Sequence, residues 1–326
     1  PFDLTGAQKR VIKEIRADMG SGKQMNRLLQ GDVGSGKTLV AIMSMLIAAD
    51  NGYQACIMAP TEILATQHYE NIKRLLSKLD INVALLTGST KKSERDVIDN
   101  GLRNGSINFI IGTHALIEEN VVFKNLGLVI VDEQHRFGVA QREALRQKGN
   151  NPDLLALSAT PIPRTLSMTI YGDMDVSIIN EKPAGRKPIK TTKLPMGRIN
   201  ELVARLQTQV DSGAKVFWVC PLVEESENVD TNMTAVVERH KMLTQYFPNA
   251  GLVHGQMDKK DRDVVMAEFA DDNSDMNLLV ATTVIEVGID VPRASIIVIE
   301  NAEAVNKSYP SFFIELKKLG GVVDGI

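Results

Sequence analysis

The most informative pattern in the chain is Gly31-Asp32-Val33-Gly34-Ser35-Gly36-Lys37-Thr38. It fits G-x-x-x-x-G-K-[ST], in which glycines allow backbone N–H groups to turn toward phosphate oxygens. Lys37 is expected to reach the β- and γ-phosphates of a nucleotide, and the Thr38 hydroxyl to bind Mg²⁺. A strand predicted at Arg27–Gln30 precedes the loop, and a helix predicted at Leu39–Ala49 follows it with its N-terminus toward the anion. The sequence therefore predicts a phosphate-binding loop, or P-loop.

A second glycine-rich segment, Gly20-Ser21-Gly22-Lys23, lies just upstream of the P-loop. It does not complete the pattern, because Ala17 stands where the first glycine is required and Gln24 follows the lysine in place of Ser or Thr. No strand is predicted before it. We therefore expect an ordinary loop at this position.

The composition is that of a globular protein of two domains. The chain has 326 residues, of which 44% are hydrophobic and 24% charged, with a net charge of −3. No apolar run approaches the ~20 residues that span a bilayer, and residues 1–6 do not start a signal peptide. We therefore expect a cytoplasmic protein with no membrane partner. Cys56 and Cys220 lie in apolar runs and are expected to be buried thiols.

Short runs rich in Val, Ile and Leu alternate with longer amphipathic stretches along the chain. Several of the runs are apolar on successive residues, which is typical of parallel strands covered on both faces. The alternation predicts an α/β fold with doubly wound parallel sheets. The predicted strands are Arg27–Gln30, Ala55–Met58, Val83–Leu86, Phe109–Ile111, Leu128–Val131, Leu154–Leu157, Lys215–Cys220, Gly251–Val253, Asn277–Ala281 and Ser295–Ile299. One predicted helix covers Thr61–Leu79, with a stripe at helical spacing of Leu64, His68, Ile72, Leu75 and Leu79.

Proline, glycine and basic residues concentrate between residues 180 and 195. Proline and glycine interrupt helix and strand alike, so this segment is predicted to be a linker. We expect an N-terminal lobe at residues 1–182, the linker at 183–195 and a second lobe at 196–326. The basic residues of the linker are explained by solvation, with contact to a phosphate backbone as the alternative.

Two carboxylates follow an apolar run, in Leu128-Val129-Ile130-Val131-Asp132-Glu133. The carboxyl ends of parallel strands form the ligand crevice of a doubly wound sheet. We expect Asp132 to hold Mg²⁺ and Glu133 to orient or deprotonate the attacking water, because a P-loop ATPase needs both near the γ-phosphate. Acids at a strand end are often only a solvated turn, and the P-loop is what favours the catalytic interpretation.

Together with this acidic segment, motifs elsewhere in the chain give the sequence a resemblance to the RecG family of branched-DNA helicases, in superfamily 2. Asp132-Glu133-Gln134-His135 with Arg136-Phe137-Gly138-Val139 is similar to the second motif of that family, whereas the related transcription-repair coupling factor usually has Glu at the third position. Other motifs follow in family order over roughly residues 1 to 303. They include Leu4-Thr5 with Gln8, Ala59-Pro60-Thr61-Glu62, Gly112-Thr113-His114, Ser158-Ala159-Thr160-Pro161, His254-Gly255-Gln256-Met257 and Ala281-Thr282-Thr283-Val284.

The resemblance implies two RecA-like lobes and a role for each motif. Gln8 would recognise adenine, and Phe2, Gly288 and Asp290 would also contact ATP. Gln134 and His135 would join the catalytic residues Lys37, Asp132 and Glu133. Coupling of the ATP state to lobe movement would fall to Ser158, Ala159 and Thr160. The residues that would touch the DNA backbone are Pro60, Thr61, Gly88, Thr113, His114, His254, Gly255, Thr282 and Thr283.

The chemistry of those DNA-contact loops agrees with a role at phosphate. Thr, Ser and Gly at strand ends offer hydroxyl and N–H groups that bind phosphate oxygens and carry no base information. An alternative is open for each of them: Thr61 and Thr283 are also suited to capping a helix, and His114 and His254 to bonding a backbone group.

The chain departs from the family pattern near its end. No arginine follows Arg293, so the family's arginine finger, worth about 10³ to 10⁵ in rate, has no counterpart. We expect the second lobe to be truncated or atypical after about residue 303. The family's wedge domain and C-terminal extension are also expected to lie outside this sequence.

Three functions remain open at this point. The first is an ATP- and Mg²⁺-dependent helicase or translocase that remodels branched DNA, such as stalled forks and Holliday junctions, as a monomer and with single-stranded DNA-binding protein as a possible partner. The second is a nucleotide-gated DNA-binding module with weak turnover, suggested by the missing arginines. The third is the motor of a transcription-repair coupling factor, against which Gln134 weighs.

Overall fold

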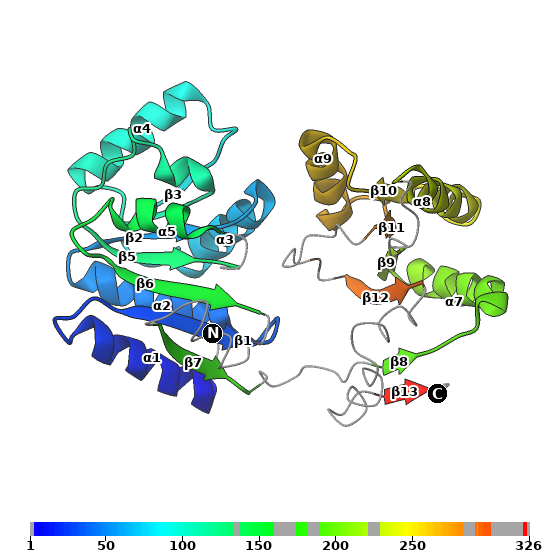
Figure 1. The fold of residues 1–326 in the computed structure, drawn as a ribbon, viewed down its shortest axis with the longest axis horizontal. Coiled ribbons are helices and arrows are strands. Elements are labelled where there is room, and N and C mark those ends of the chain that lie inside the picture. Colours follow the sequence, from blue (N-terminus) through cyan, green and yellow to red (C-terminus); the bar gives the residue numbers. More distant parts are fainter. Residues whose placement is uncertain are drawn as a thin grey trace. The chain divides into compact units, whose positions relative to one another are not determined.

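The computed structural model describes residues 3–133, 137–159, 174–181, 190–220, 229–282, 291, 293–300 and 322–324. Contacts divide the chain into two compact units, Pro1–Arg186 and Lys187–Ile326, here called lobe 1 and lobe 2 (Figure 1). Each described part is built of parallel strands and helices, which confirms the predicted α/β class. None of the helices in these described ranges is long and apolar enough to cross a membrane.

Lobe 1 contains a parallel sheet of seven strands in the order β3-β4-β2-β5-β6-β1-β7. The six strands predicted for this lobe are all present, within two residues of their expected bounds. The seventh, β7, was not predicted. The strands are β1 Asn26–Gly31, β2 Gln54–Met58, β3 Val83–Leu86, β4 Phe109–Gly112, β5 Leu126–Val131, β6 Asp153–Ser158 and β7 Asp175–Ile179.

The helices of lobe 1 cover both faces of this sheet. They are α1 Gly6–Met19, α2 Lys37–Asp50, α3 Glu62–Leu75, α4 Lys92–Asn104, the 3-10 helix η1 His114–Ile117 and α5 Val139–Arg146. Successive strand residues point to opposite faces. In β2, Cys56 and Met58 join a buried cluster with Leu102 of α4 and Leu145 of α5. The central strands are therefore buried on both faces, which explains their unbroken apolar runs.

The helix predicted at Thr61–Leu79 is shorter than expected. Thr61 caps α3, since its side chain accepts the Leu64 N–H at 3.3 Å. The helix ends at Leu75, and Leu79 is 52% exposed, so it does not belong to the buried stripe. The glycine-rich segment before β1 is a loop, as predicted.

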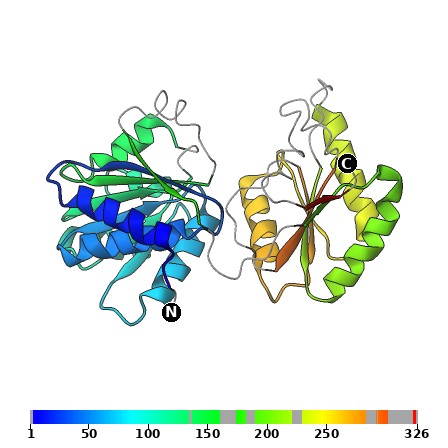
Figure 2. The same cartoon turned by 90° about the horizontal axis from the view of Figure 1, so that it is seen from below.

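Lobe 2 contains a parallel sheet of four described strands in the order β10-β11-β9-β12. Figure 2 shows α7 and α8 on one side of it and α9 on the other. Trp218 of β9 is buried in the core and Phe217 packs edge-on against Phe269 of α9, as expected for core aromatics. The elements are α7 Ile199–Asp211, β9 Lys215–Val219, α8 Val229–Thr244, β10 Gly251–Val253, α9 Lys259–Ala270, β11 Leu278–Ala281 and β12 Ala294–Ile299.

A short parallel pair lies apart from that sheet in lobe 2. It joins β8, Lys190–Thr192, to β13, Val322–Asp324. A 3-10 helix η3, Met196–Arg198, precedes α7. The segment 183–195, predicted as a linker, therefore includes a strand of three residues that its proline and glycine content did not predict.

Both cysteines are buried free thiols, as predicted. Cys56 is inaccessible to solvent and Cys220 is 8% exposed. Burial raises the pKa of Cys56 to about 12, and burial together with the neighbouring Glu300 carboxylate raises the pKa of Cys220 to about 12. A thiol held in this state is a poor nucleophile near neutral pH.

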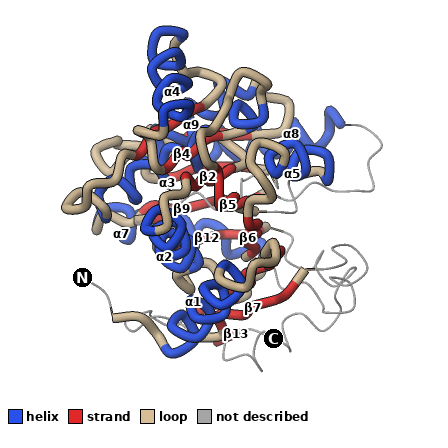
Figure 3. The backbone as a smooth tube through the Cα atoms, turned by 90° about the vertical axis from the view of Figure 1, so that its left-hand side faces the viewer, coloured by secondary structure: helices blue, strands red, loops and turns tan. Residues whose placement is uncertain are grey.

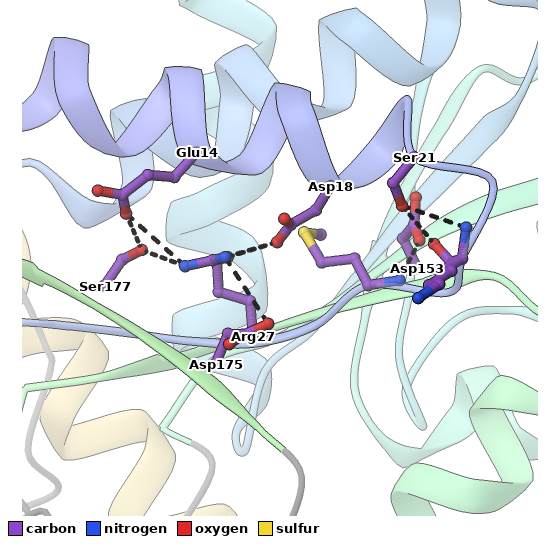
Figure 4. A network of polar contacts seen from close by, with 9 residues as sticks. Glu14, Asp18, Ser21, Arg27, Asp153, Asp175 and Ser177 are labelled. Atoms are coloured by element: carbon purple, nitrogen blue, oxygen red, sulfur yellow. Dashed lines mark hydrogen bonds and ion pairs between the residues drawn. The ribbon is translucent and has the colours of Figure 1, made fainter.

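A buried arginine ties α1 and β7 to the P-loop strand β1 (Figure 4). The guanidinium of Arg27 is bonded to Asp18 at 2.7 Å and to the Ser177 hydroxyl at 2.8 Å. Glu14 and Asp175 lie 3.6 and 3.8 Å from it, and the Ser177 hydroxyl donates to Glu14. Figure 3 shows α1 beside β7, which it contacts. This network, here called the Arg27 network, holds the first helix against the strand that carries the P-loop.

Candidate nucleotide-binding site and DNA-contact loops

The P-loop adopts a conformation that only glycine accepts without strain at two positions. Gly34 has φ of 75° and Gly36 has φ of 89°, both in the left-handed region. A Cβ on Gly36 would lie 2.2 Å from Nε2 of Gln8. The Lys37 ammonium donates to the carbonyls of Gly31 at 2.6 Å and Asp32 at 3.0 Å, so the loop closes around it. This is the curled backbone that the pattern predicts for binding phosphate.

Gln8 connects helix α1 to the P-loop. Its Oε1 accepts the Thr5 N–H at 3.0 Å while the Thr5 hydroxyl accepts the Gln8 N–H at 3.2 Å, which forms a capping box. The Nε2 of the same side chain donates to the Ser35 carbonyl at 2.9 Å. Gln8 is 3% exposed. The residue expected to recognise adenine is thus fixed from both sides, by the cap of α1 and by the loop.

The two carboxylates after β5 lie where that strand leaves the sheet. Asp132 is 9% and Glu133 5% exposed. The Asp132 N–H donates to the Met58 carbonyl of β2 at 2.9 Å, and its Oδ1 accepts the Glu133 N–H at 3.0 Å. Glu133 has φ of 50°, which is uncommon for a residue with a side chain and costs on the order of 1–3 kcal/mol. Strained backbone of this kind is concentrated at functional sites.

These carboxylates act electrostatically on the P-loop lysine. Burial lowers the pKa of Lys37, and the charges of Glu133, Asp132 and Asp32 oppose that lowering, in this order of size. Strand β5, which these acids follow, and β1, which the P-loop follows, are separated in the sheet by β6 alone. The structure therefore brings together Lys37, Asp132 and Glu133, whose roles were predicted separately from two segments about a hundred residues apart.

His68 is a functional candidate that sequence analysis did not recognise. Its Nε2 lies 2.7 Å from Oδ2 of Asp132. The side chains of both residues are 12% exposed. The sequence showed His68 only as one position of the α3 stripe, and nothing local indicates a partner 64 residues away.

The donors at this site suit Mg²⁺ and a nucleotide. Mg²⁺ prefers oxygen ligands and is ordinarily held by one or two protein groups together with substrate phosphates. The Thr38 hydroxyl at the start of α2 and the Asp132 carboxylate are such groups, and the P-loop pattern predicts that Lys37 and the loop amides would face the phosphates.

The strand order places the Ser158 segment between the P-loop and the Asp132 segment. Strand β6 lies between β5 and β1, and Ser158 at its end is paired in register with Gln30, next to the P-loop. Ser158 is 1% exposed and Ala159 is partly buried. This position, between the P-loop and the Asp132 segment, is consistent with the coupling role that the resemblance implies for them.

The DNA-contact candidates of lobe 1 gather at the carboxyl ends of β2, β3 and β4. The Thr113 N–H donates to the Leu86 carbonyl at 3.3 Å, which fixes the β4 end beside β3. Thr113 is buried and its hydroxyl has no hydrogen-bond partner in the part of the chain that the structure describes, whereas His114 is exposed. A Cβ on Gly88 would lie 3.2 Å from Glu62, which follows the predicted contacts Pro60 and Thr61. Thr61 itself caps α3, as the alternative interpretation proposed.

The candidates of lobe 2 also gather at one edge of their sheet. The Thr282 N–H, after β11, donates to the Val253 carbonyl of β10 at 3.2 Å, next to His254. Among the described residues the Thr282 hydroxyl and Nδ1 of His254 have no hydrogen-bond partner, and both atoms are buried, whereas Gly255 is exposed. Burial lowers the pKa of His254. Three of the predicted contacts, His254, Gly255 and Thr282, therefore lie together at this edge.

Some predicted site residues lie outside the described residues. They are Phe2, Gln134, His135, Thr160, Thr283, Gly288 and Asp290. The segment from residue 301 to 321, where the sequence departs from the family pattern, lies outside them as well. The roles assigned to these residues stay predictions.

Two family profiles match the chain. That of the DEAD/DEAH box helicases matches residues 5–169, about half of the chain, and that of the helicase conserved C-terminal domain matches residues 198–312. The first range contains the P-loop and Asp132, and the second contains His254 and Thr282. The two profiles fall one in each lobe.

Named relatives are similar to the chain over nearly all of its length. The ATP-dependent DNA helicase RecG of Thermotoga maritima is 54% identical over 306 residues, which cover 93% of this chain and 39% of the relative. The protein of the same name from Bacillus subtilis is 48% identical over 93% of this chain and 44% of the relative. The chain therefore spans about two fifths of the length of these relatives.

Solved structures agree with the sequence comparisons. A structure of RecG bound to a three-way DNA junction superposes with a TM-score of 0.81 at 50% identity, over 93% of this chain and 39% of that one. The helicase Lhr of Mycobacterium smegmatis, bound to single-stranded DNA and AMP-PNP, superposes with a TM-score of 0.58 at 19% identity, covering 91% of this chain and 44% of that one, and supports the fold alone. The resemblance found in the motifs is thus confirmed. The chain belongs to the DEAD/DEAH box helicase family and has a helicase core of the RecG type.

Proposed function

We propose that the chain is the ATP-driven motor core of a helicase or translocase that remodels branched DNA, such as stalled forks and four-way junctions. The observation that supports the proposal is that the P-loop with Lys37 follows β1, and Asp132 and Glu133 follow β5, in one parallel sheet with only β6 between these strands. The similarity to a RecG protein bound to a three-way DNA junction supports branched DNA as the substrate.

The proposed mechanism divides the work among the residues of this edge. Lys37 and the P-loop amides bind the phosphates, and Glu133 orients or deprotonates the attacking water. Thr38 and Asp132 would hold Mg²⁺, which neutralises charge on the phosphates when it is bound. The burial of Asp132 and Glu133 strengthens their electrostatic effect, because water screens them less there.

DNA is proposed to bind through its backbone along the strand ends of both lobes. The hydroxyls of Thr113 and Thr282 have no hydrogen-bond partner among the described residues, and hydroxyl groups suit phosphate oxygens and do not distinguish bases. A motor must tolerate every sequence it crosses, so contacts of this kind fit the proposed function. Single-stranded DNA-binding protein as a partner and a monomeric state also remain part of the proposal, as do the lobe bounds 1–182 and 196–326.

Lys37→Ala tests the proposed function. ATP hydrolysis by the 326-residue chain is measured with and without forked DNA. The variant is expected to lose DNA-stimulated hydrolysis because the β- and γ-phosphates lose their cationic partner. Lys23→Ala, in the glycine-rich loop that lacks the complete pattern, is the matched control and should hydrolyse ATP like the parent. Normal hydrolysis by Lys37→Ala would show the proposal to be wrong.

The same measurement separates the two alternatives. DNA-stimulated turnover by the parent chain would exclude a module that only binds, which the absence of arginine after Arg293 had suggested. The relatives reported above are named RecG, which does not favour the transcription-repair coupling factor. Retention of the chain on immobilised RNA polymerase would favour that factor instead.

A further inference from the structure

The contact between His68 and Asp132 has no part in the roles assigned so far. Oδ2 of Asp132 lies 2.7 Å from Nε2 of His68, and Oδ1 accepts the Glu133 N–H. Each carboxylate oxygen therefore has a partner, one from its own turn and one from helix α3. Since an ionised carboxylate only accepts hydrogen bonds, Nε2–H of His68 is the donor in this pair.

Helix α3 holds His68 firmly. Leu64 and Ile72 lie four residues before and after His68 and therefore share its face of the helix, and both are buried, as is Ala65. The Thr61 cap fixes the start of the helix. These contacts anchor α3 without any help from His68. The imidazole is thus available to hold another group, and the group it meets is the carboxylate expected on Mg²⁺.

We propose that His68 is a positioning residue of the ATPase site, which holds the Asp132 carboxylate in the orientation that Mg²⁺-bound nucleotide requires. The inference rests on the proposed function, because it takes Asp132 as the Mg²⁺ carboxylate. Carboxylates that ligate metals are ordinarily oriented by a hydrogen bond from a neighbouring group, and loss of that neighbour weakens metal affinity or activity by about 10–100-fold.

The geometry also distinguishes this role from simple packing. A packing role needs volume at position 68, and several side chains would supply it. A positioning role needs an N–H donor at the distance of Nε2 from the helix. Gln places an amide N–H near that distance, whereas Asn carries the same amide on a shorter side chain.

The test measures binding of a fluorescent ATP analogue to the whole 326-residue chain as Mg²⁺ is varied, and again in EDTA. His68→Ala and His68→Asn are expected to raise the Mg²⁺ concentration for half-maximal binding by about 10–100-fold, with binding in EDTA unchanged. For His68→Gln, the Mg²⁺ concentration for half-maximal binding should lie within about threefold of that of the parent. Thr66→Ala, on the exposed side of the same helix, is the control and should match the parent.

The outcomes separate this inference from the proposed function. Equal Mg²⁺ requirements for the parent and all three His68 variants would overturn the inference and leave the proposed function intact. A Gln variant no better than the Asn variant would also overturn it, because the donor would then not matter. Failure of the parent to bind the analogue under any condition would overturn both. Thermal unfolding of each variant identifies any that does not fold, and the Gln and Asn pair still gives a result if the Ala variant is lost.

Discussion

Lys37 lies in a partly buried environment that disfavours the charged form of its side chain. Burial lowers the pKa of Lys37 from 10.5, and three carboxylates compensate only in part. The unfolded chain therefore binds this proton more tightly, so the free energy of unfolding contributed by Lys37 rises as the pH rises through the lowered pKa toward 10.5. The residue that the P-loop pattern assigns to phosphate binding thus reduces stability at neutral pH, as functional residues often do.

Replacing Lys37 by Met is expected to remove that cost. Lys37→Met should be at least as stable as the parent at pH 7, and should lose part of the rise in stability between pH 7 and pH 9.5. Urea unfolding at the two pH values measures both effects. Lys23→Met, at a lysine outside the P-loop, should leave the pH dependence as it is. A clear loss of stability at pH 7 in Lys37→Met alone would contradict the argument.

Gly36 carries two constraints that can be separated. Its φ of 89° disfavours any side chain by about 1–2 kcal/mol, and a Cβ there would also meet Nε2 of Gln8. Gly36→Ala should therefore cost more stability than Gly22→Ala, where φ is 73° and nothing lies within 4 Å. Adding Gln8→Ala should recover part of the loss in the Gly36 variant and none in the Gly22 variant. Strictly additive effects in a double-mutant cycle would show that the clash is relieved in some other way.

The residues that sequence analysis missed share one property. His68 and Arg27 each meet partners far away along the chain, Asp132 at 64 and Ser177 at 150 residues. Their own surroundings look ordinary, a polar position on a helix and a cation at the start of an apolar run. The P-loop and the Asp132 segment were recognisable because the chemistry of each lies within a few consecutive residues.

At the scale of elements, the Arg27 network joins α1, β1 and β7. Arg27→Ala removes the cation from a partly buried group of acids and should lower the free energy of unfolding by about 2–3 kcal/mol, at or below the lower end for a fully buried pair, since Asp175 is mostly exposed. Denaturant unfolding measures the loss. Arg205→Ala, which breaks an exposed pair with Glu201, is the control and should leave stability unchanged. Equal effects of the two substitutions would mean that the network does not hold the elements together.

How well an element was predicted depended on its burial. Strands such as β2 and β4 are buried along their whole length and read as unbroken apolar runs. Strand β7 lies at the sheet edge with Val176 and Ile178 exposed, so Asp175–Ile179 shows no such run. The three-residue strands β8 and β13 are too short to show a pattern at all. Pairing of distant segments, not local preference, creates these three strands.

At the scale of the molecule, each lobe has a core of its own. A cluster around Met58 and Val131 belongs to lobe 1, and another around Trp218 and Val280 belongs to lobe 2. A unit with its own core is expected to fold alone. The isolated segment 1–186 should unfold in a single cooperative transition and bind Mg²⁺ and ATP. Calorimetry and analogue binding measure the two properties, and a segment without a cooperative transition would show that lobe 1 depends on the rest of the chain.

The state of the two cysteines has a practical consequence for labelling the chain and testing the proposed motor function. Because Cys56 and Cys220 are buried with a pKa of about 12, maleimide dyes should react with neither thiol in the folded chain. A single cysteine introduced on the surface of each lobe would then be labelled selectively without replacing Cys56 or Cys220. Energy transfer between the two dyes would report, molecule by molecule, whether ATP and DNA change the distance between the lobes.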